Sequence, residues 1–192
     1  MPRIPRGQLD GHAFHVLNRG NGRSTIFHKD ADFRAFIEIL AEAKTRVSVR
    51  TAAFCVLPNH FHLVVAPTPH ADISAFMHWW LTTRVRRYHR HYGSSGHVWR
   101  GRFKSFPIQT DDHFLTVVRY VLQNPVRARL ATQVDDWPWS SLRFPALLVA
   151  WPVPQPEGID WLQSPLAEAE LERLRTSVQR QTPSGACPGS IP

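Results

Sequence analysis

Two stretches of the chain have the hydrophobic periodicity of amphipathic α-helices. In residues 30–46 the apolar side chains fall at the i, i+3, i+4, i+7 and i+8 positions of one buried face, occupied by Phe33, Phe36, Ile37, Leu40 and Ala41. In residues 72–91 the inward face is made by Ile73, Phe76, Met77 and Trp80. Each stretch is therefore predicted to be a helix with one buried side.

Four other stretches have the alternation and β-branched content of strands. They are residues 12–18, residues 49–57, a run that begins at His60, and a segment that leads from residues 98–106 to an end near Thr110. A turn at Leu57-Pro58-Asn59 joins the second and third strands as an antiparallel hairpin. The order strand–helix–strand–strand–helix–strand predicts an α+β fold with both helices on one face of an antiparallel sheet.

The remainder of the chain is predicted to add a third helix and a tail. Asp111 is the expected N-cap of a helix through Asn124, which Pro125 should end. Residues 137–141, Trp-Pro-Trp-Ser-Ser, have the composition of a docking segment. The tail should be extended over the proline-rich residues 145–165, helical over 164–180 and disordered over 183–192. We therefore expect a basic arm at 1–11, a folded domain at 12–144, and a linker, short helix and disordered end at 145–192.

The histidine strand carries the first candidate chemistry. His60 and His62 are two positions apart, so they point to the same face, whereas Phe61, Leu63 and Val65 point to the core. Two imidazoles on one face of a strand are two of the three ligands that a metal site needs. The alternative is a pair of surface histidines on an amphipathic strand.

The third predicted helix carries the second group of candidate functional residues. At about 100° per residue its polar side chains group on one face: His113, Thr116, Tyr120, Gln123 and Asn124. Asn124 lies one turn after Tyr120, so both can reach one metal or one substrate. Tyr120 can also be an edge aromatic, and an asparagine before a proline commonly ends a helix.

A tyrosine beside two histidines suggests phosphoryl transfer. A phenol is a poor nucleophile at pH 7 unless its substrate is made electrophilic. A divalent cation on the phosphate oxygens has that effect, and it also orients the phosphate. His60, His62 and the Asn124 carboxamide provide mixed nitrogen and oxygen donors, which suit Mg²⁺ or Mn²⁺ and do not exclude zinc.

Composition points to a polyanionic partner. The 192 residues include 23 Lys+Arg and 15 Asp+Glu, a formal net charge of +8, and only Lys29, Lys44 and Lys104 are lysines. Arginine's planar fork suits phosphate oxygens, so nucleic acid is favoured over an anionic membrane. No apolar run approaches the roughly 20 residues of a membrane span, and residues 1–6 lack the apolar segment expected of a secretory signal. The two cysteines suggest neither a disulfide framework nor a zinc site. We expect a cytoplasmic protein.

Basic residues gather in patterns that would suit a phosphate-binding groove. Arg84 and Arg87 share a stripe of the second helix, and Arg100, Arg102 and Lys104 alternate onto one strand face. Arg19, Arg119 and Arg127 complete the set of predicted DNA contacts, and Trp99 is the predicted base-stacking residue because it lies in a basic, glycine-flanked loop. The alternative is an ordinary solvated surface.

Five sequence blocks, in order, resemble the single-tyrosine HUH transposases and most closely the REP-associated tyrosine transposases of bacteria. They are Phe14-His15-Val16-Leu17-Asn18-Arg19-Gly20, Leu57-Pro58-Asn59-His60-Phe61-His62-Leu63, Trp99-Arg100-Gly101-Arg102-Phe103-Lys104-Ser105, Arg119-Tyr120 with Asn124-Pro125-Val126-Arg127-Ala128, and Trp139-Ser140-Ser141. The likeness spans residues 14–144. After Arg180 the chain departs from the Gly-Pro-Phe-Gly-like stretch expected of that branch.

The resemblance implies a ferredoxin-like domain that cleaves single-stranded DNA at palindromic hairpins. Tyr120 would form a 5′-phosphotyrosine and release a 3′-hydroxyl, with His60, His62 and Asn124 as ligands of Mg²⁺ or Mn²⁺. Repetitive extragenic palindromes would be the DNA, the bacterial nucleoid the place of action, and a monomer or a swapped homodimer the active species. Two alternatives stay open: a hairpin-binding protein without catalysis, and a metal-dependent hydrolase that uses water as the nucleophile.

Overall fold

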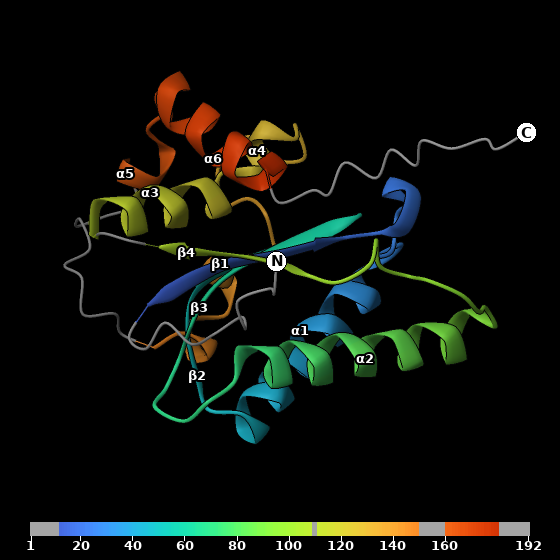
Figure 1. The fold of residues 1–192 in the computed structure, drawn as a ribbon. Coiled ribbons are helices and arrows are strands. Elements are labelled where there is room, and N and C mark those ends of the chain that lie inside the picture. The colour runs from blue at the N-terminus through green and yellow to red at the C-terminus, as the bar shows by residue number, and fades with distance from the viewer. Residues whose placement is uncertain (1–11, 109–110, 150–159, 181–192) are drawn as a thin grey trace, which may run out of the picture.

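The computed structural model describes residues 12–108, 111–149 and 160–180. Its centre is a four-stranded antiparallel sheet with the order β2-β3-β1-β4. Helices α1 (Asp30–Arg46) and α2 (Ile73–Tyr92) cover one face, and α3 (Asp111–Leu122) covers the other (Figure 1). This is the strand order of a ferredoxin-like fold, so the predicted fold class is confirmed.

The strands lie close to their predicted positions. They are β1 (Ala13–Arg19), β2 (Val49–Leu57), β3 (His60–Pro67) and β4 (Lys104–Ile108). The fourth is shorter than the segment suggested, because Val98 and Trp99 belong to a loop that pairs with Gly20 through an isolated bridge. Strands β3 and β1 are central, so groups placed on them are held by neighbours on both sides.

Side-chain alternation along the strands divides the core into two layers. One layer joins the sheet to α1 and α2, where Phe36 and Trp80 stack with their ring centroids 4.4 Å apart. It contains Phe61, Leu63 and Val65, as the alternation of β3 predicted. The second layer lies between the sheet and α3. His60 and His62 therefore point to the α3 side of the sheet.

The end of α3 differs from the prediction. We expected one helix through Asn124 that Pro125 ends, but α3 ends at Leu122 and a short helix α4 (Asn124–Arg127) follows. Pro125 lies in the first turn of α4, where the missing N–H costs no helical hydrogen bond. The backbone N–H of Arg127 donates to the Gln123 carbonyl at 3.0 Å. The proline thus redirects the chain without ending its helical path.

The predicted docking segment at residues 137–141 lies along the edge strand β2. The Val56 N–H donates to the Trp139 carbonyl at 2.9 Å, and the Trp137 indole N–H donates to the Val56 carbonyl at 2.9 Å. The Trp139 ring stacks on Phe33 at 5.1 Å. The segment therefore satisfies backbone groups that an open sheet edge would expose.

The tail is more helical than predicted. Two short 3-10 helices, η2 (Ser141–Arg143) and η3 (Pro145–Leu147), are followed beyond residue 159 by α5 (Asp160–Gln163) and α6 (Glu168–Arg180). The tail helix was predicted to begin at residue 164 and begins four residues later, at Glu168. The stretch at 145–165 that was expected to be extended is partly helical. The predicted arm at 1–11 and the end at 183–192 lie outside the described residues. Among those that are described, no helix has the length and apolar character needed to cross a membrane.

Candidate active site

The two histidines of β3 meet a third on the neighbouring central strand. In the β1–β3 register His60 lies opposite Arg19 and His62 opposite Leu17, which places His15 diagonally beside His62. The ring centroids of His60 and His62 are 5.2 Å apart. His62 is buried and His60 is half-buried, so the pair forms the floor of a site rather than an exposed surface pair.

Hydrogen bonds set the orientation of the His60 ring. Its Nδ1 lies 2.6 Å from the Asn59 side-chain oxygen. The Asn59 amide donates to the Arg23 carbonyl at 3.0 Å, which identifies the atom facing His60 as the oxygen. An oxygen acceptor requires a proton on His60 Nδ1, so Nε2 carries the lone pair. That is the tautomer in which Nε2 can bind a metal.

The surroundings hold both rings in their neutral form. Burial, with a contribution from the charge of Arg19, lowers the pKa of His60 to about 3. Burial, then the nearby His15 and His60, lowers the pKa of His62 well below its ordinary value. Only a neutral imidazole has a lone pair for a metal. The two rings therefore fit a divalent cation without having to lose a proton first.

Tyr120 lies against the histidines on the α3 side of the sheet. Its ring centroid is 5.7 Å from that of His62 and 5.9 Å from that of His15, with edge-to-face geometry at both. The Arg127 guanidinium lies 4.2 Å from the same ring centroid. The break between α3 and α4 brings Arg127 back over Tyr120. The structure thus brings together the tyrosine and the histidine pair singled out in the sequence.

Asn124 is buried at the junction of α3 and α4. Its side-chain amide donates to the Tyr120 carbonyl at 2.8 Å, as a residue that ends a helix does. This bond uses the nitrogen, so the side-chain oxygen is the atom through which Asn124 would ligate a metal. Across the described part of the chain, no three His, Cys, Asp or Glu side chains are placed to hold a metal. A three-ligand site here therefore depends on this carboxamide.

Basic residues surround the His60 end of the site. The Arg100 N–H donates to the Arg19 carbonyl at 2.8 Å, which brings the loop before β4 to the end of β1. Burial and the neighbouring Arg23 lower the pKa of Arg19, and burial and Arg100 lower the pKa of Lys104. These mutual effects show that the cations share one region. Arg102 is exposed in the same loop.

The structure places two other predicted DNA contacts inside the fold. The Arg84 side chain is buried, donates to the Ile26 carbonyl at 2.9 Å and lies over the ring of Phe27. Trp99 is 7% exposed, and its ring packs on Phe61 at 5.6 Å. Both side chains have core roles, so we do not carry them forward as DNA contacts.

The remaining predicted contacts lie away from the tyrosine ring. Arg87 is exposed on α2, across the sheet from α3 (Figure 1). Arg119 lies on α3 and forms an ion pair of 3.2 Å with Glu170 of α6. Neither side chain is among those that contact the Tyr120 ring.

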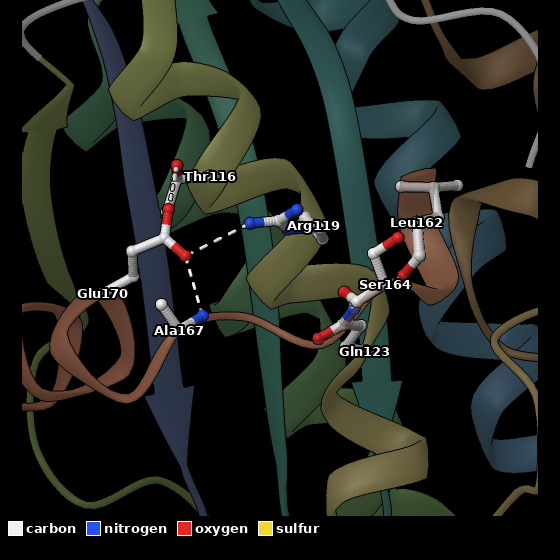
Figure 2. A network of polar contacts seen from close by, with 7 residues as sticks. All are labelled: Thr116, Arg119, Gln123, Leu162, Ser164, Ala167 and Glu170. Atoms are coloured by element: carbon white, nitrogen blue, oxygen red, sulfur yellow. Dashed lines mark hydrogen bonds and ion pairs between the residues drawn. The ribbon is translucent and has the colours of Figure 1, made fainter. Parts of the chain in front are cut away.

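Part of the α3 face that was predicted to be polar is covered by the tail. Figure 2 shows Thr116 and Arg119 meeting Glu170, and Gln123 meeting the end of α5 and the residue that follows it. The Gln123 amide donates to the carbonyls of Leu162 at 2.7 Å and Ser164 at 2.6 Å. Neither this contact nor a role for His15 was predicted from the sequence. The available signal for His15 was a histidine inside an apolar, alternating strand. Its contact with His62 could not be predicted, because it depends on the register between β1 and β3.

A tyrosine helix laid over a histidine-bearing, ferredoxin-like sheet defines the class of single-tyrosine transposases. The family model described as "Transposase IS200 like" matches residues 8–124, and the chain belongs to this family. The resemblance predicted from the sequence blocks is confirmed.

Individual relatives point to one branch of that family. A Haemophilus influenzae protein assigned as a REP-associated tyrosine transposase is 30% identical over 102 residues, which cover 47% of this chain and 57% of that protein. The REP-associated tyrosine transposase of Escherichia coli K12 is 24% identical over 151 residues, which cover 79% of this chain and 84% of that protein. A solved REP-associated tyrosine transposase bound to a REP hairpin superimposes with a TM-score of 0.61 at 21% identity, over 87% of this chain and 99% of that one, and it shows the same fold.

Proposed function

We propose that the protein is a metal-dependent endonuclease and strand transferase that acts on single-stranded DNA carrying a palindromic hairpin. The observation that carries the proposal is the placement of Tyr120 against His62, 5.7 Å between ring centroids, on the face to which His60 also points. The endonuclease domain would comprise residues 12–144, and α5 and α6 would support its α3 helix.

Tyr120 would act as the nucleophile. Its hydroxyl oxygen forms a bond to the phosphorus, and the bond between that phosphorus and the 3′ oxygen of the preceding nucleotide breaks. The phenol proton passes to water, and the leaving 3′ oxygen takes up a proton. The products are a 5′-phosphotyrosine and a free 3′-hydroxyl, which can attack the adduct in a later strand transfer.

The histidine pair would hold the cation. The Nδ1 atoms of His60 and His62 are both engaged in hydrogen bonds, so a metal would meet the Nε2 atoms, and Asn124 would add its side-chain oxygen. Bound Mg²⁺ or Mn²⁺ would neutralise charge on the non-bridging oxygens of the phosphate. The strands keep the two rings neutral and fixed on the floor of the site. This donor set, nitrogen and neutral oxygen with open positions, fits such an ion.

The hairpin partner is proposed from the basic residues and the relatives. Arg19, Arg100, Arg102, Lys104 and Arg127 lie around the site and would hold the DNA backbone near the cleaved phosphate. The solved relative was captured with a REP hairpin, and two curated relatives are REP-associated transposases. Arg87 stays a predicted contact, placed where only a more distant part of the DNA would meet it.

The test is a covalent-adduct assay. Single-stranded hairpin DNA labelled at its 3′ end is incubated with protein and Mg²⁺ or Mn²⁺, then resolved on a denaturing gel. We expect a labelled protein band that Tyr120→Phe abolishes and that Tyr88→Phe and Tyr92→Phe leave intact, since those two rings pack together on α2.

Three results would contradict the proposal in different ways. Binding without cleavage in either metal would favour a non-catalytic hairpin-binding protein. Cleavage with no protein-linked product would favour a hydrolase that uses water. An adduct that survives in Tyr120→Phe would show that another side chain is the nucleophile.

A further inference from the structure

His15 has a buried hydrogen bond that the catalytic assignment leaves unexplained. Its Nε2 lies 2.9 Å from Nδ1 of His62, and the two ring planes differ by only 20°. The two side chains are 3% and 5% exposed. His15 also approaches the Tyr120 ring, with centroids 5.9 Å apart, and the Phe106 ring, with centroids 6.0 Å apart. It thus contacts both the proposed nucleophile and a proposed metal ligand, which also contact each other.

Packing alone does not account for an imidazole at this position. The neighbours of His15 on the same sheet face include Ala13 and Ile108, and α3 covers that face with further apolar groups. A buried polar ring in such surroundings loses its contacts with water and is tolerated when a partner replaces them. The partner here is one nitrogen of His62. The pair is therefore built for that contact.

The bond can have only two directions, because a neutral imidazole has one donor and one acceptor nitrogen. If His15 Nε2 donates, then His62 carries its own proton on Nε2 and has no lone pair left on that atom. If His62 Nδ1 donates, then His62 Nε2 has the lone pair. Only the second arrangement leaves His62 able to bind a metal through the nitrogen that His15 does not occupy.

The neighbouring histidine shows the same arrangement by an independent contact. His60 Nδ1 faces the Asn59 side-chain oxygen, which can only accept. His60 therefore has its proton on Nδ1 and its lone pair on Nε2. A matched acceptor for His62 would give both rings the same tautomer. On the sheet face, His15 is the side chain placed to be that acceptor.

We propose that His15 is a positioning residue that accepts a hydrogen bond from His62 Nδ1 and thereby fixes the tautomer and ring orientation in which His62 Nε2 binds the divalent cation. This inference rests on the proposed metal role of His62. Partners that orient metal-ligating histidines in this way typically change metal affinity 10–100-fold when removed. His15 itself would touch neither the metal nor the DNA.

The first test reads the tautomer in the metal-free, wild-type protein. Long-range proton–nitrogen NMR correlations of the imidazoles distinguish a protonated nitrogen from one with a lone pair. We expect His62 to be protonated on Nδ1 and His15 to have its lone pair on Nε2. A His62 ring protonated on Nε2 would overturn the proposal. This measurement needs neither DNA nor activity.

The second test measures Mn²⁺ affinity by the EPR signal of the free ion. His15→Phe keeps a ring of similar size but removes the acceptor, and it should weaken Mn²⁺ binding about 10–100-fold. His15→Gln retains an acceptor oxygen near the position of Nε2 and should recover most of the affinity. His78→Phe is the matched control, because that histidine is exposed on α2 across the sheet. Equal affinity in folded His15→Phe and wild type would refute the proposal.

The two proposals fail separately. If no adduct forms with any DNA but His62 has the expected tautomer and His15→Phe loses Mn²⁺, the endonuclease assignment fails and the role of His15 stands. If Tyr120 forms the adduct but His62 is protonated on Nε2, the role of His15 fails alone.

Discussion

Replacing Gln123 should release the tail from α3 while leaving the sheet intact. The Gln123 amide donates to the Leu162 and Ser164 carbonyls at 2.7 Å and 2.6 Å, and the side chain is 6% exposed. Gln123→Ala removes both bonds and leaves a buried carbonyl on Leu162 without this donor. A typical hydrogen bond contributes about 0.5–1.5 kcal/mol, and an unsatisfied buried group costs about 1–3 kcal/mol. We therefore expect about 2 kcal/mol less stability for the docked tail.

The consequence should be local because α5 and α6 pack on the α3 side of the domain and contribute no strand to the sheet. A loss of about 2 kcal/mol raises the population of the opened segment by about 30-fold. Hydrogen–deuterium exchange should accelerate by that factor in residues 160–180, whereas amides of the two central strands should keep their protection. The unfolding midpoint of the sheet, followed by circular dichroism, should change little.

Two further variants sharpen the experiment. Gln123→Glu keeps the size of the side chain but directs a carboxylate at two carbonyls, so its effect should be at least as large. Gln133→Ala makes the same change at an exposed loop position and should have none. Unchanged exchange in residues 160–180 of Gln123→Ala would show that other contacts hold the tail and that our reasoning about Gln123 is wrong.

Other measurements check the site, the reassigned Arg84 and the pH dependence of stability. His60→Ala and His62→Ala should each lose Mn²⁺ binding and adduct formation with the fold retained, whereas a variant that still binds Mn²⁺ would exclude that ring as a ligand. Arg127→Met should slow adduct formation at least two- to fivefold, since a cation over an aromatic ring is worth about 0.5–1 kcal/mol, and Arg127→Lys should slow it less. Arg84→Ala should lower the free energy of unfolding by about 2 kcal/mol or more, because it removes a buried hydrogen bond to Ile26; weaker hairpin binding in a fully stable variant would instead restore Arg84 as a DNA contact. Stability should fall below pH 6.5, because burial lowers the pKa values of His15 and His60 to about 3 in the folded protein, so only the unfolded chain takes up protons between those values. The loss by pH 5 is on the order of 2 kcal/mol per ring, and urea titrations that give equal stability at pH 7 and pH 5 would contradict it.

The sequence was sufficient for the fold because its local signals agreed with one another. The helix at Asp30–Arg46 and the strand at Val49–Leu57 have the predicted bounds. Period-2 alternation in β3 also placed both histidines on one face. Boundaries failed where tertiary contacts decide them, as at β4, whose preceding loop pairs with Gly20 instead of extending the strand.

The site was predictable only as far as each element determines its own faces. Periodicity put Tyr120 opposite the apolar stripe of its helix, but that side turned out to be buried, with Tyr120 toward the sheet and Gln123 under the tail. Arg84 and Trp99 show the same limit. A basic stripe or a glycine-flanked loop gives the charge and composition of a surface, but tertiary contacts decide which side chains are inside, here those with Ile26, Phe27 and Phe61.

The histidines and the tyrosine of the candidate site lie on elements that are held in different ways. His15, His60 and His62 lie on the two central strands, where neighbours on both sides hold the backbone. Tyr120 lies on a helix whose outer side is held by Gln123 and by the ion pair between Arg119 and Glu170, contacts made by a tail beyond the family match at residues 8–124. The proposed metal ligands therefore belong to strands that are paired on both sides, and the proposed nucleophile belongs to a helix that depends on a peripheral support. Changes in the tail should alter the position of Tyr120 before they alter the histidine pair.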